Sequence, residues 1–324
     1  MKLLEIKDRI INFIEKHDTI SRIITKFIIA LIVFVTINKN IGYFEIISSA
    51  PVAIGTAIAC ALLPVNAILW LAMFAVMLDM YALSPEVAIV VGIVFLIFIF
   101  LYCRFAPEDG ILMLFTPILF RYHIPYVMPV AAGLLRGVYS AIGVALGTVI
   151  FYFIDGIKQN ADTLKSIASS NSEESTTKIN VSLNQILGNK ELVFVLIVMV
   201  ISTLVVYIVR RRQIEHAWTI ATFAGALIQI GSLIAGYMLF NLSDKTLEII
   251  IGNVIAIIVG LIIQFFFMNL DYSRVENVQF EDDDYYYYVK AVPKKMLGKE
   301  EKTVKHFGNT TSIGKKIPRE NEEK

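Results

Sequence analysis

The sequence predicts an all-α integral membrane protein: a helical bundle of about eight transmembrane helices, with a re-entrant hairpin and a short strand-prone cytoplasmic tail. Two observations lead to this class. Of the 324 residues, 56 % are hydrophobic and only 18 % are charged, which is too apolar for a soluble domain. The charged residues also concentrate at residues 1–26, 156–190 and 270–324, leaving long runs nearly free of charge. We therefore expect a lipid bilayer around most of the chain.

Residues 1–23 are predicted to form a cytoplasmic amphipathic helix. Its apolar residues recur at helical spacing: Leu3, Ile6, Ile10, Phe13 and Ile14. Such a helix lies flat on a membrane interface or packs against another part of the same protein, and the sequence leaves both alternatives open. Charged and amphipathic residues precede the next apolar run, which has no small-residue cleavage site, so we expect a retained span there.

A transmembrane domain is predicted over residues 24–269. A run of about 20 apolar residues spans the hydrocarbon core, and prolines mark some of the turns, because proline interrupts helical hydrogen bonding. The expected spans are residues 24–38, 45–63, 66–83, 86–103, 138–155, 191–209, 217–240 and 247–269.

Small and polar residues predict how these spans pack. Gly133-x3-Gly137 and Gly143-x3-Gly147 allow a close approach between two helices. Gln229, Asn253 and Gln264 lie inside spans, and each is expected to bond to a neighbouring helix.

The orientation follows from the basic residues. Arg210, Arg211 and Arg212 form the densest basic cluster beside any span, and such clusters face the cytoplasm. Both termini, including the tail at residues 270–324, are then cytoplasmic, and residues 156–190 form an extracytoplasmic loop. This loop is rich in Ser, Asn and Thr, which favours disorder over a small folded lobe.

Residues 105–137 are predicted to begin and end on the cytoplasmic side. They contain two apolar pieces, Ile111–Phe120 and Ile124–Leu135. At about 1.5 Å per residue, each piece reaches roughly half-way across a bilayer, which favours a re-entrant hairpin. The alternative is a pair of tilted complete spans with Arg121, Tyr122 and His123 at the outer surface.

The densest set of ionisable residues near the membrane lies in and around this hairpin. Its members are Arg104, Glu108, Asp109, Arg121, His123 and Arg136. Charges inside a bilayer are costly and face water or a partner, and broken helices around a polar centre are typical of transporter substrate sites. We therefore take these six residues as a candidate polar membrane site. The alternative is that Arg104, Glu108 and Asp109 form an ordinary loop and Arg121 anchors an interface.

The tail combines acidic, aromatic and basic residues. The residues of interest are Phe280, Asp282, Asp283, Asp284, Tyr285, Tyr286, Tyr287, Tyr288 and Pro293. Tyrosine and valine favour strands, and a lone strand needs a sheet to join. Since the chain shows no other strand-rich segment, we expect residues 278–292 to pair with a cytoplasmic partner's sheet or with a second copy. A solvated, unstructured segment is the alternative.

Enzymatic motifs are absent from the sequence. Neither HExxH nor GxSxG occurs, and Gly308–Lys316 departs from the phosphate-loop pattern in spacing and in its last residue. Cys60 and Cys103 form no metal-binding pattern. We expect no enzyme, no cofactor, no metal and no nucleic-acid partner, and any ATPase would be supplied by another chain.

The tail read with the body resembles an uncharacterised family of clostridial multi-pass membrane proteins. The resemblance rests on FEDDDYYYYVKAVPK (Phe280–Lys294), on Arg210–Arg212 before Ala217-Trp218-Thr219-Ile220, and on the turn Arg104–Gly110. Members of this family are sometimes labelled ABC transporter permeases. The resemblance implies the cytoplasmic membrane of a bacterium.

Two functions follow as expectations. The first is a permease-like transport component with residues 105–137 lining a path. The second is a non-transporting scaffold whose tail recruits a cytoplasmic partner. They differ in one structural property, because a transporter needs polar groups that face an aqueous cavity, whereas a scaffold can be packed throughout.

Overall fold

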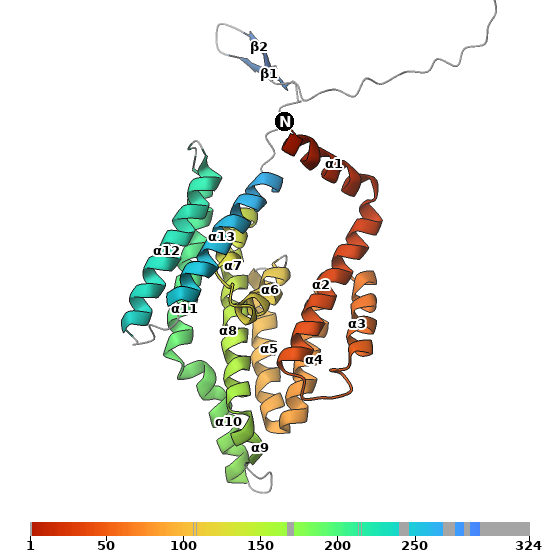
Figure 1. Cartoon of the computed structure of the whole chain (residues 1–324), viewed down its shortest axis with the longest axis vertical. Helices are drawn as coiled ribbons and strands as arrows, with labels where there is room; N and C mark the ends of the chain where they lie inside the picture. Colours follow the sequence, from red (N-terminus) through yellow and green to blue (C-terminus); the bar gives the residue numbers. More distant parts are fainter. Residues whose placement is uncertain are drawn as a thin grey trace, which may run out of the picture. The chain divides into compact units, whose positions relative to one another are not determined.

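The computed structural model describes residues 2–105, 107, 109–166, 172–212, 214, 216–239, 246–267, 276–281 and 286–291. The chain divides into two units, Met1–Met268 and Asn269–Lys324. The regular elements of the first unit, in its described residues, are all helices, joined by turns and loops (Figure 1). Its helices are α1 (Lys2–Lys16), α2 (Asp18–Asn40), α3 (Ala50–Leu62), α4 (Asn66–Leu83), α5 (Pro85–Phe105), α6 (Gly110–Arg121), α7 (Val127–Leu135), α8 (Ser140–Gln159), α9 (Ala161–Ser166), α10 (Ser172–Leu187), α11 (Lys190–Arg210), α12 (Ala217–Leu239) and α13 (Thr246–Phe267).

Seven helices in the described part of the chain are long and apolar enough to cross a membrane: α2, α4, α5, α8, α11, α12 and α13. Large hydrophobic side chains such as Phe100 and Leu247 are exposed on them, as lipid-facing residues are. The protein is therefore a multi-pass helical membrane protein, and the predicted fold class is confirmed. The predicted span at residues 45–63 is shorter in the structure, because α3 begins only beside Pro51 and has 13 residues.

Buried apolar side chains form two core clusters. The first joins α2, α3, α4, α5 and α9, and the second joins α7, α11, α12 and α13. Helices α6 and α8 contribute to both: Met113 and Phe153 belong to the first cluster, and Leu112 and Val144 to the second. In Figure 1, α8 accordingly runs between the two groups of helices.

The close contact between α6 and α8 depends on glycine. A Cβ atom at Gly147 would lie 2.5 Å from Thr116 Cβ and 2.9 Å from Met113 O, and one at Gly143 would lie 3.4 Å from Asp109 O. Non-bonded carbon atoms are in contact at about 3.5–4.0 Å, so a side chain at Gly147 would force the two helices apart. The predicted close approach at Gly143-x3-Gly147 is confirmed. At Gly133-x3-Gly137 the expectation was wrong for one of the two glycines: a Cβ atom at Gly133 would lie 2.6 Å from Val206 Cβ, but one at Gly137 meets nothing within 4 Å.

Two of the three predicted polar contacts join different helices. Gln229 on α12 donates to Ser202 Oγ on α11 at 2.7 Å, and Gln264 on α13 accepts from Thr219 Oγ1 on α12 at 3.0 Å. The expectation for Asn253 was wrong, because its amide donates to Ile249 O one turn earlier in its own helix at 2.9 Å.

The segment at residues 156–190, which the sequence predicts to be disordered, contains α9 and α10. Helix α10 packs against α5 and α8, and its residues Ile179, Val181 and Leu183 lie against the first core cluster. Lys178 is 3 % exposed and lies 3.6 Å from Glu86. The prediction failed because it followed the high Ser, Asn and Thr content of the segment. The few apolar residues, together with the buried ion pair, are enough to hold a helix against the bundle.

The apolar stripe of α1 is exposed on its described side chains. Ile6, Ile10, Phe13 and Ile14 are all exposed, while Lys7 on another face is buried and its ammonium lies 5.7 Å from the centre of the Phe265 ring. This placement is the one that a helix lying on a membrane interface requires, so it favours that one of the two alternatives that the sequence leaves open.

The second unit contains a two-stranded antiparallel sheet. Strand β1 (Glu276–Glu281) pairs with β2 (Tyr286–Ala291), with Val278 opposite Val289 and Phe280 opposite Tyr287. The expectation that the chain offers no second strand was therefore wrong. The physical reason is the run Asp282–Asp284, since aspartate disfavours strands and favours turns, so residues 278–292 divide into two strands.

Candidate functional site

Helices α6 and α7 form the two legs of the predicted hairpin. They have 12 and 9 residues, which correspond to lengths of roughly 18 and 14 Å. Pro117 lies within α6 and does not end it. The Arg136 Nε at the end of α7 lies 3.4 Å from the Asp109 carboxylate at the start of α6, so both outer ends of the hairpin meet.

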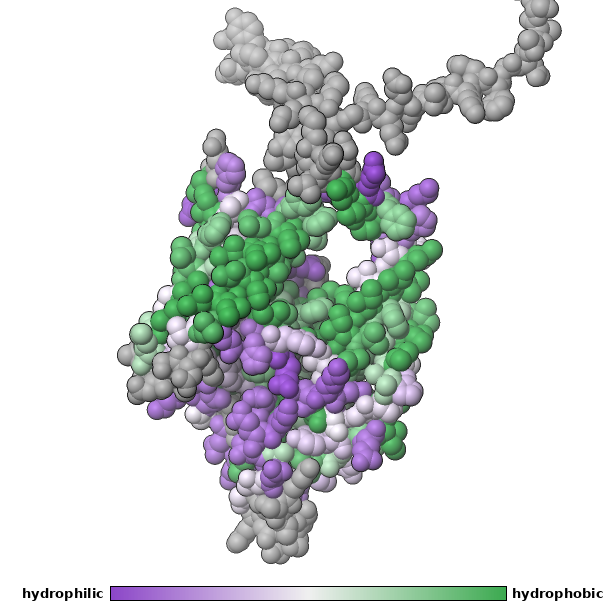
Figure 2. Space-filling view, viewed as in Figure 1, coloured by the Kyte–Doolittle hydropathy of each residue, from purple (hydrophilic) through white to green (hydrophobic). Residues whose placement is uncertain are grey.

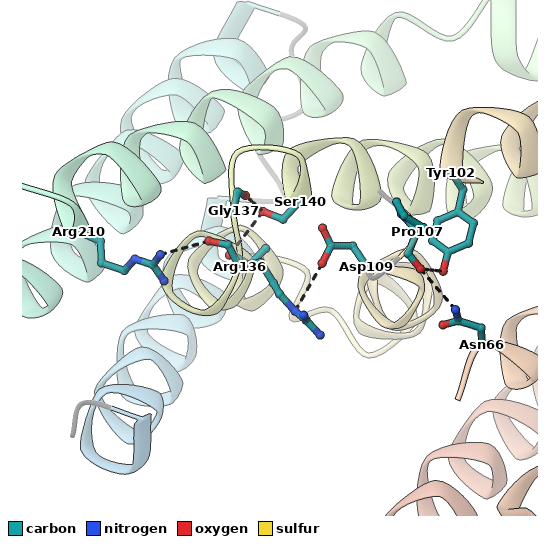
Figure 3. A network of polar contacts seen from close by, with 9 residues as sticks. Asn66, Tyr102, Pro107, Asp109, Arg136, Gly137, Ser140 and Arg210 are labelled. Atoms are coloured by element: carbon teal, nitrogen blue, oxygen red, sulfur yellow. Dashed lines mark hydrogen bonds and ion pairs between the residues drawn. The ribbon is translucent and has the colours of Figure 1, made fainter. Parts of the chain in front are cut away.

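These outer ends are fixed by hydrogen bonds to backbone carbonyls (Figure 3). The Arg210 guanidinium donates to Leu134 O and, at 3.3 Å, to Arg136 O, which satisfies carbonyls at the end of α7 that have no partner within the helix. On the other leg, the Tyr102 hydroxyl and the Asn66 amide both donate to Pro107 O. We call this region, with Asp109, Arg136 and Arg210, the arginine end.

The tip of the hairpin lies at the opposite end. His123 takes a left-handed backbone conformation with φ 60°, and its Nδ1 lies 2.8 Å from Glu248 Oε1. Glu248 is in the first turn of α13, and α11 begins nearby with Glu191 in its first turn. Since α11 begins beside the tip and reaches the arginine end at Arg210, the hairpin lies alongside α11.

The six predicted site residues therefore do not form one site. Asp109 and Arg136 pair at the arginine end, and Arg104 is exposed at the end of α5. Arg121 and His123 lie at the tip, separated from Asp109 by the length of α6. Glu108 lies outside the described residues. In the tail, Phe280 and Tyr286–Tyr288 belong to the strands, whereas Asp282–Asp284, Tyr285 and Pro293 lie outside the described residues.

A polar cavity of about 340 Å³ opens at the tip, between the hairpin and α8, α11, α12 and α13. We call it the tip cavity. Its lining includes three carboxylates that the sequence analysis missed, from Asp155, Glu191 and Glu248, together with Arg121 and His123. Figure 2 shows hydrophilic side chains gathered in the centre of the viewed face, between hydrophobic surfaces over α13 and α2.

Tyrosines complete the tip cavity. The hydroxyls of Tyr152 and Tyr237 both donate to Glu191 Oε1, at 3.2 and 2.9 Å. Glu191 is held in place because the Asn189 side chain accepts from Leu192 N at 3.0 Å and caps the start of α11. Tyr126 also lines the cavity; it is 6 % exposed.

The positions of the three carboxylates bear on whether the cavity could bind a metal ion. Among the residues that the structure describes, no group of three or more His, Cys, Asp or Glu side chains is placed to hold a metal ion. The three carboxylates are distributed around the wall, one each on α8, α11 and α13. Each of these acids lies at the end of an apolar run in the sequence. Listing the residues at those run ends that the predicted topology puts on the same side of the membrane would have brought the three acids together.

Comparisons with known proteins add no family to this geometry. Searches against protein-family models, curated proteins and solved structures gave no match to the chain.

Proposed function

We propose that the protein is a permease-like transport component of a bacterial cytoplasmic membrane. The observation that carries the proposal is the tip cavity, because it presents ionisable and hydroxyl groups to an open space between apolar helices. A bundle that serves only as a scaffold has no need of such a space. The resemblance to clostridial membrane proteins is the basis for the bacterial membrane. Any ATPase that drives transport belongs to another chain.

A second cavity supports a path along the hairpin. It is an open cavity of about 620 Å³ at the arginine end, lined by Asp109, Arg136, Arg210 and Arg211 among others. Met113 on α6, between the two ends of the hairpin, is fully buried. Two cavities at opposite ends of one broken-helix hairpin support a path along it, because transporters build substrate sites at such interrupted helices.

The proposal is tested by solute exchange in proteoliposomes. Purified full-length protein is reconstituted, and counterflow of radiolabelled tetraethylammonium, spermidine, glutamate and phosphate is measured, which needs no ATPase. We expect exchange of at least one solute above empty liposomes. Tyr126→Trp, which fills the tip cavity, should reduce it severalfold, whereas the exposed Tyr81→Trp should not. Absence of exchange for every solute would contradict the transport proposal.

We also predict the orientation of the chain in the membrane. Because the basic cluster Arg210–Arg212 faces the cytoplasm, Ser170→Cys should react with a membrane-impermeant thiol reagent on intact cells, and Ser312→Cys should react only after lysis. Both positions lie outside the described residues. The reverse labelling pattern would overturn the orientation.

Labelling of the tip tests how far the hairpin extends. Tyr122 is 55 % exposed, and its neighbour His123 bonds to Glu248 in the first turn of α13, which supports the alternative of two complete spans over the re-entrant hairpin. We therefore expect Tyr122→Cys to react at a rate close to that of Ser170→Cys, while the buried Ile68→Cys stays unreactive. Protection of Tyr122→Cys as complete as that of Ile68→Cys would restore the shallow re-entrant hairpin.

The scaffold remains a second candidate because of the tail. A sheet of two strands is marginal alone and leaves one edge of each strand unpaired, so addition to a cytoplasmic partner's sheet or to a second copy, through residues 278–292, would stabilise it. Full-length protein in detergent, used as bait against lysate, should retain a partner or self-associate. Replacing Tyr286 and Tyr288 with lysine should abolish this. Identical behaviour of the two baits would leave the tail as a spacer.

A further inference from the structure

The lining of the tip cavity indicates which solutes it accepts. We propose that it binds an organic cation, such as a protonated amine or a quaternary ammonium compound. This inference rests on the proposed transport function, because it names the substrate class of the same site.

Charge is the first argument. The lining contains three carboxylates, Asp155, Glu191 and Glu248, against one guanidinium, that of Arg121, and the imidazole of His123, which contacts Glu248 at 2.8 Å. Arg121 also lines an apolar groove between α2, α4, α6 and α8, so it lies at the border of the cavity. Between low-dielectric walls, a negative lining concentrates cations and repels anions.

The tyrosine hydroxyls fix the direction of one of these acids, because Tyr152 and Tyr237 both donate to Glu191 Oε1. Asp155 accepts from the amide of Gln159 at 2.7 Å. These donors are neutral groups, which orient a carboxylate without adding a positive charge beside it. An ionised carboxylate has about four acceptor positions on its two oxygens, so one carboxylate can bond to more than one donor at a time.

Aromatic rings supply the second argument. Tyr126, Tyr152 and Tyr237 line the same cavity as Glu191, and Phe120 stacks on Phe151 at its edge with ring centres 4.8 Å apart. The faces of tyrosine rings attract cations, and rings combined with carboxylates are the common way to recognise an ammonium group. Anions gain nothing from these faces.

Tyr126 provides an independent indication that a ligand enters. Its side chain is more than nine-tenths buried and lines the cavity. The hydroxyls of the two neighbouring tyrosines bond to Glu191, whereas no such bond within the described residues holds the Tyr126 hydroxyl. The Tyr126 hydroxyl is not among the fully buried polar atoms that lack a partner, so it is placed at the cavity wall to bond to a solute or to the water that precedes it.

Binding to the full-length protein in lipid nanodiscs tests the inference. Isothermal titration with tetraethylammonium chloride and with spermidine should give saturable binding, and sodium glutamate and phosphate should give none. Glu191→Gln should weaken cation binding by about tenfold or more, the effect of losing a charge-assisted contact. Its amide oxygen can still accept from both tyrosines, so the unfolding temperature should change little.

Matched variants separate charge from folding. Glu248→Gln should also weaken cation binding, and Asp18→Asn should not, because Asp18 pairs with Arg22 on the surface of α2 at 2.7 Å and lines no described cavity. Binding of the anions, absence of cation binding, or unchanged affinity in both glutamine variants would overturn the inference. Cation binding without solute exchange would contradict transport alone, and exchange restricted to anions would contradict the cation site alone.

Discussion

Gly147→Leu is expected to lower the free energy of unfolding by about 3 kcal/mol, the upper part of the range for overpacking a tight core. A Cβ atom there would already lie 2.5 Å from Thr116 Cβ and 2.9 Å from the backbone oxygen of Met113. Backbone cannot move aside as a flexible side chain does, so α6 must separate from α8. The change should appear as a lower unfolding temperature by circular dichroism in detergent micelles.

Gly55→Leu is the matched control for this substitution. Gly55 also lies within an apolar helix, α3, but a Cβ atom there meets nothing within 4 Å. We expect its unfolding temperature to equal that of the wild type or to exceed it slightly, since leucine favours helix over glycine. Equal destabilisation by both leucines would mean that the α6–α8 contact is looser than the structure shows.

Arg210→Ala is expected to destabilise the arginine end by about 2–4 kcal/mol. It removes the donors to Leu134 O and Arg136 O, and unsatisfied carbonyls in an apolar setting are costly. It also removes the guanidinium that lies 5.4 Å from the Trp218 ring centre. Thermal unfolding in detergent measures the loss.

Two further arginine variants define the cause. Arg212→Ala removes a neighbouring exposed arginine and should be neutral within about 0.5 kcal/mol. Arg210→Lys keeps the charge but not the forked geometry that reaches two carbonyls, so its stability should fall between those of the alanine variant and the wild type. If Arg210→Ala and Arg212→Ala behave alike, the carbonyl contacts do not contribute to stability.

The long spans could be predicted closely because each is an unbroken apolar run. The run at 66–83 coincides with α4, and the run at 191–209 matches α11 to within one residue at each end. The length of the apolar run does not predict the helix where the helix begins after the run does. In α3 the helix begins beside Pro51, several residues into the predicted span. It also fails in α10, where most residues are polar and a few apolar ones hold the helix against α5 and α8.

The site could be predicted only in part. The pairing of Asp109 with Arg136 agrees with the expectation that residues 105–137 begin and end on one side. The tip cavity could not be found from local spacing, because Glu191 and Glu248 are 57 positions apart, as their numbers show, and only the packing of α11 beside the hairpin and α13 brings them together. The tail hairpin was missed because its two strands were read as one.

The dependence of α7 on Arg210 bears on how the protein is made. Arg210 is 76 positions later in the chain than Leu134, whose carbonyl it caps, and two further helices of the second core cluster, α12 and α13, follow it. When α7 leaves the ribosome, none of these neighbours has been synthesised. A nine-residue helix is marginally stable alone, and its C-terminal carbonyls without hydrogen-bond partners are costly to place in the hydrocarbon core. Its final position is therefore reached late, after α11 has entered the membrane, and nascent chains that stop before Lys190 would hold α7 only through α6 and α8.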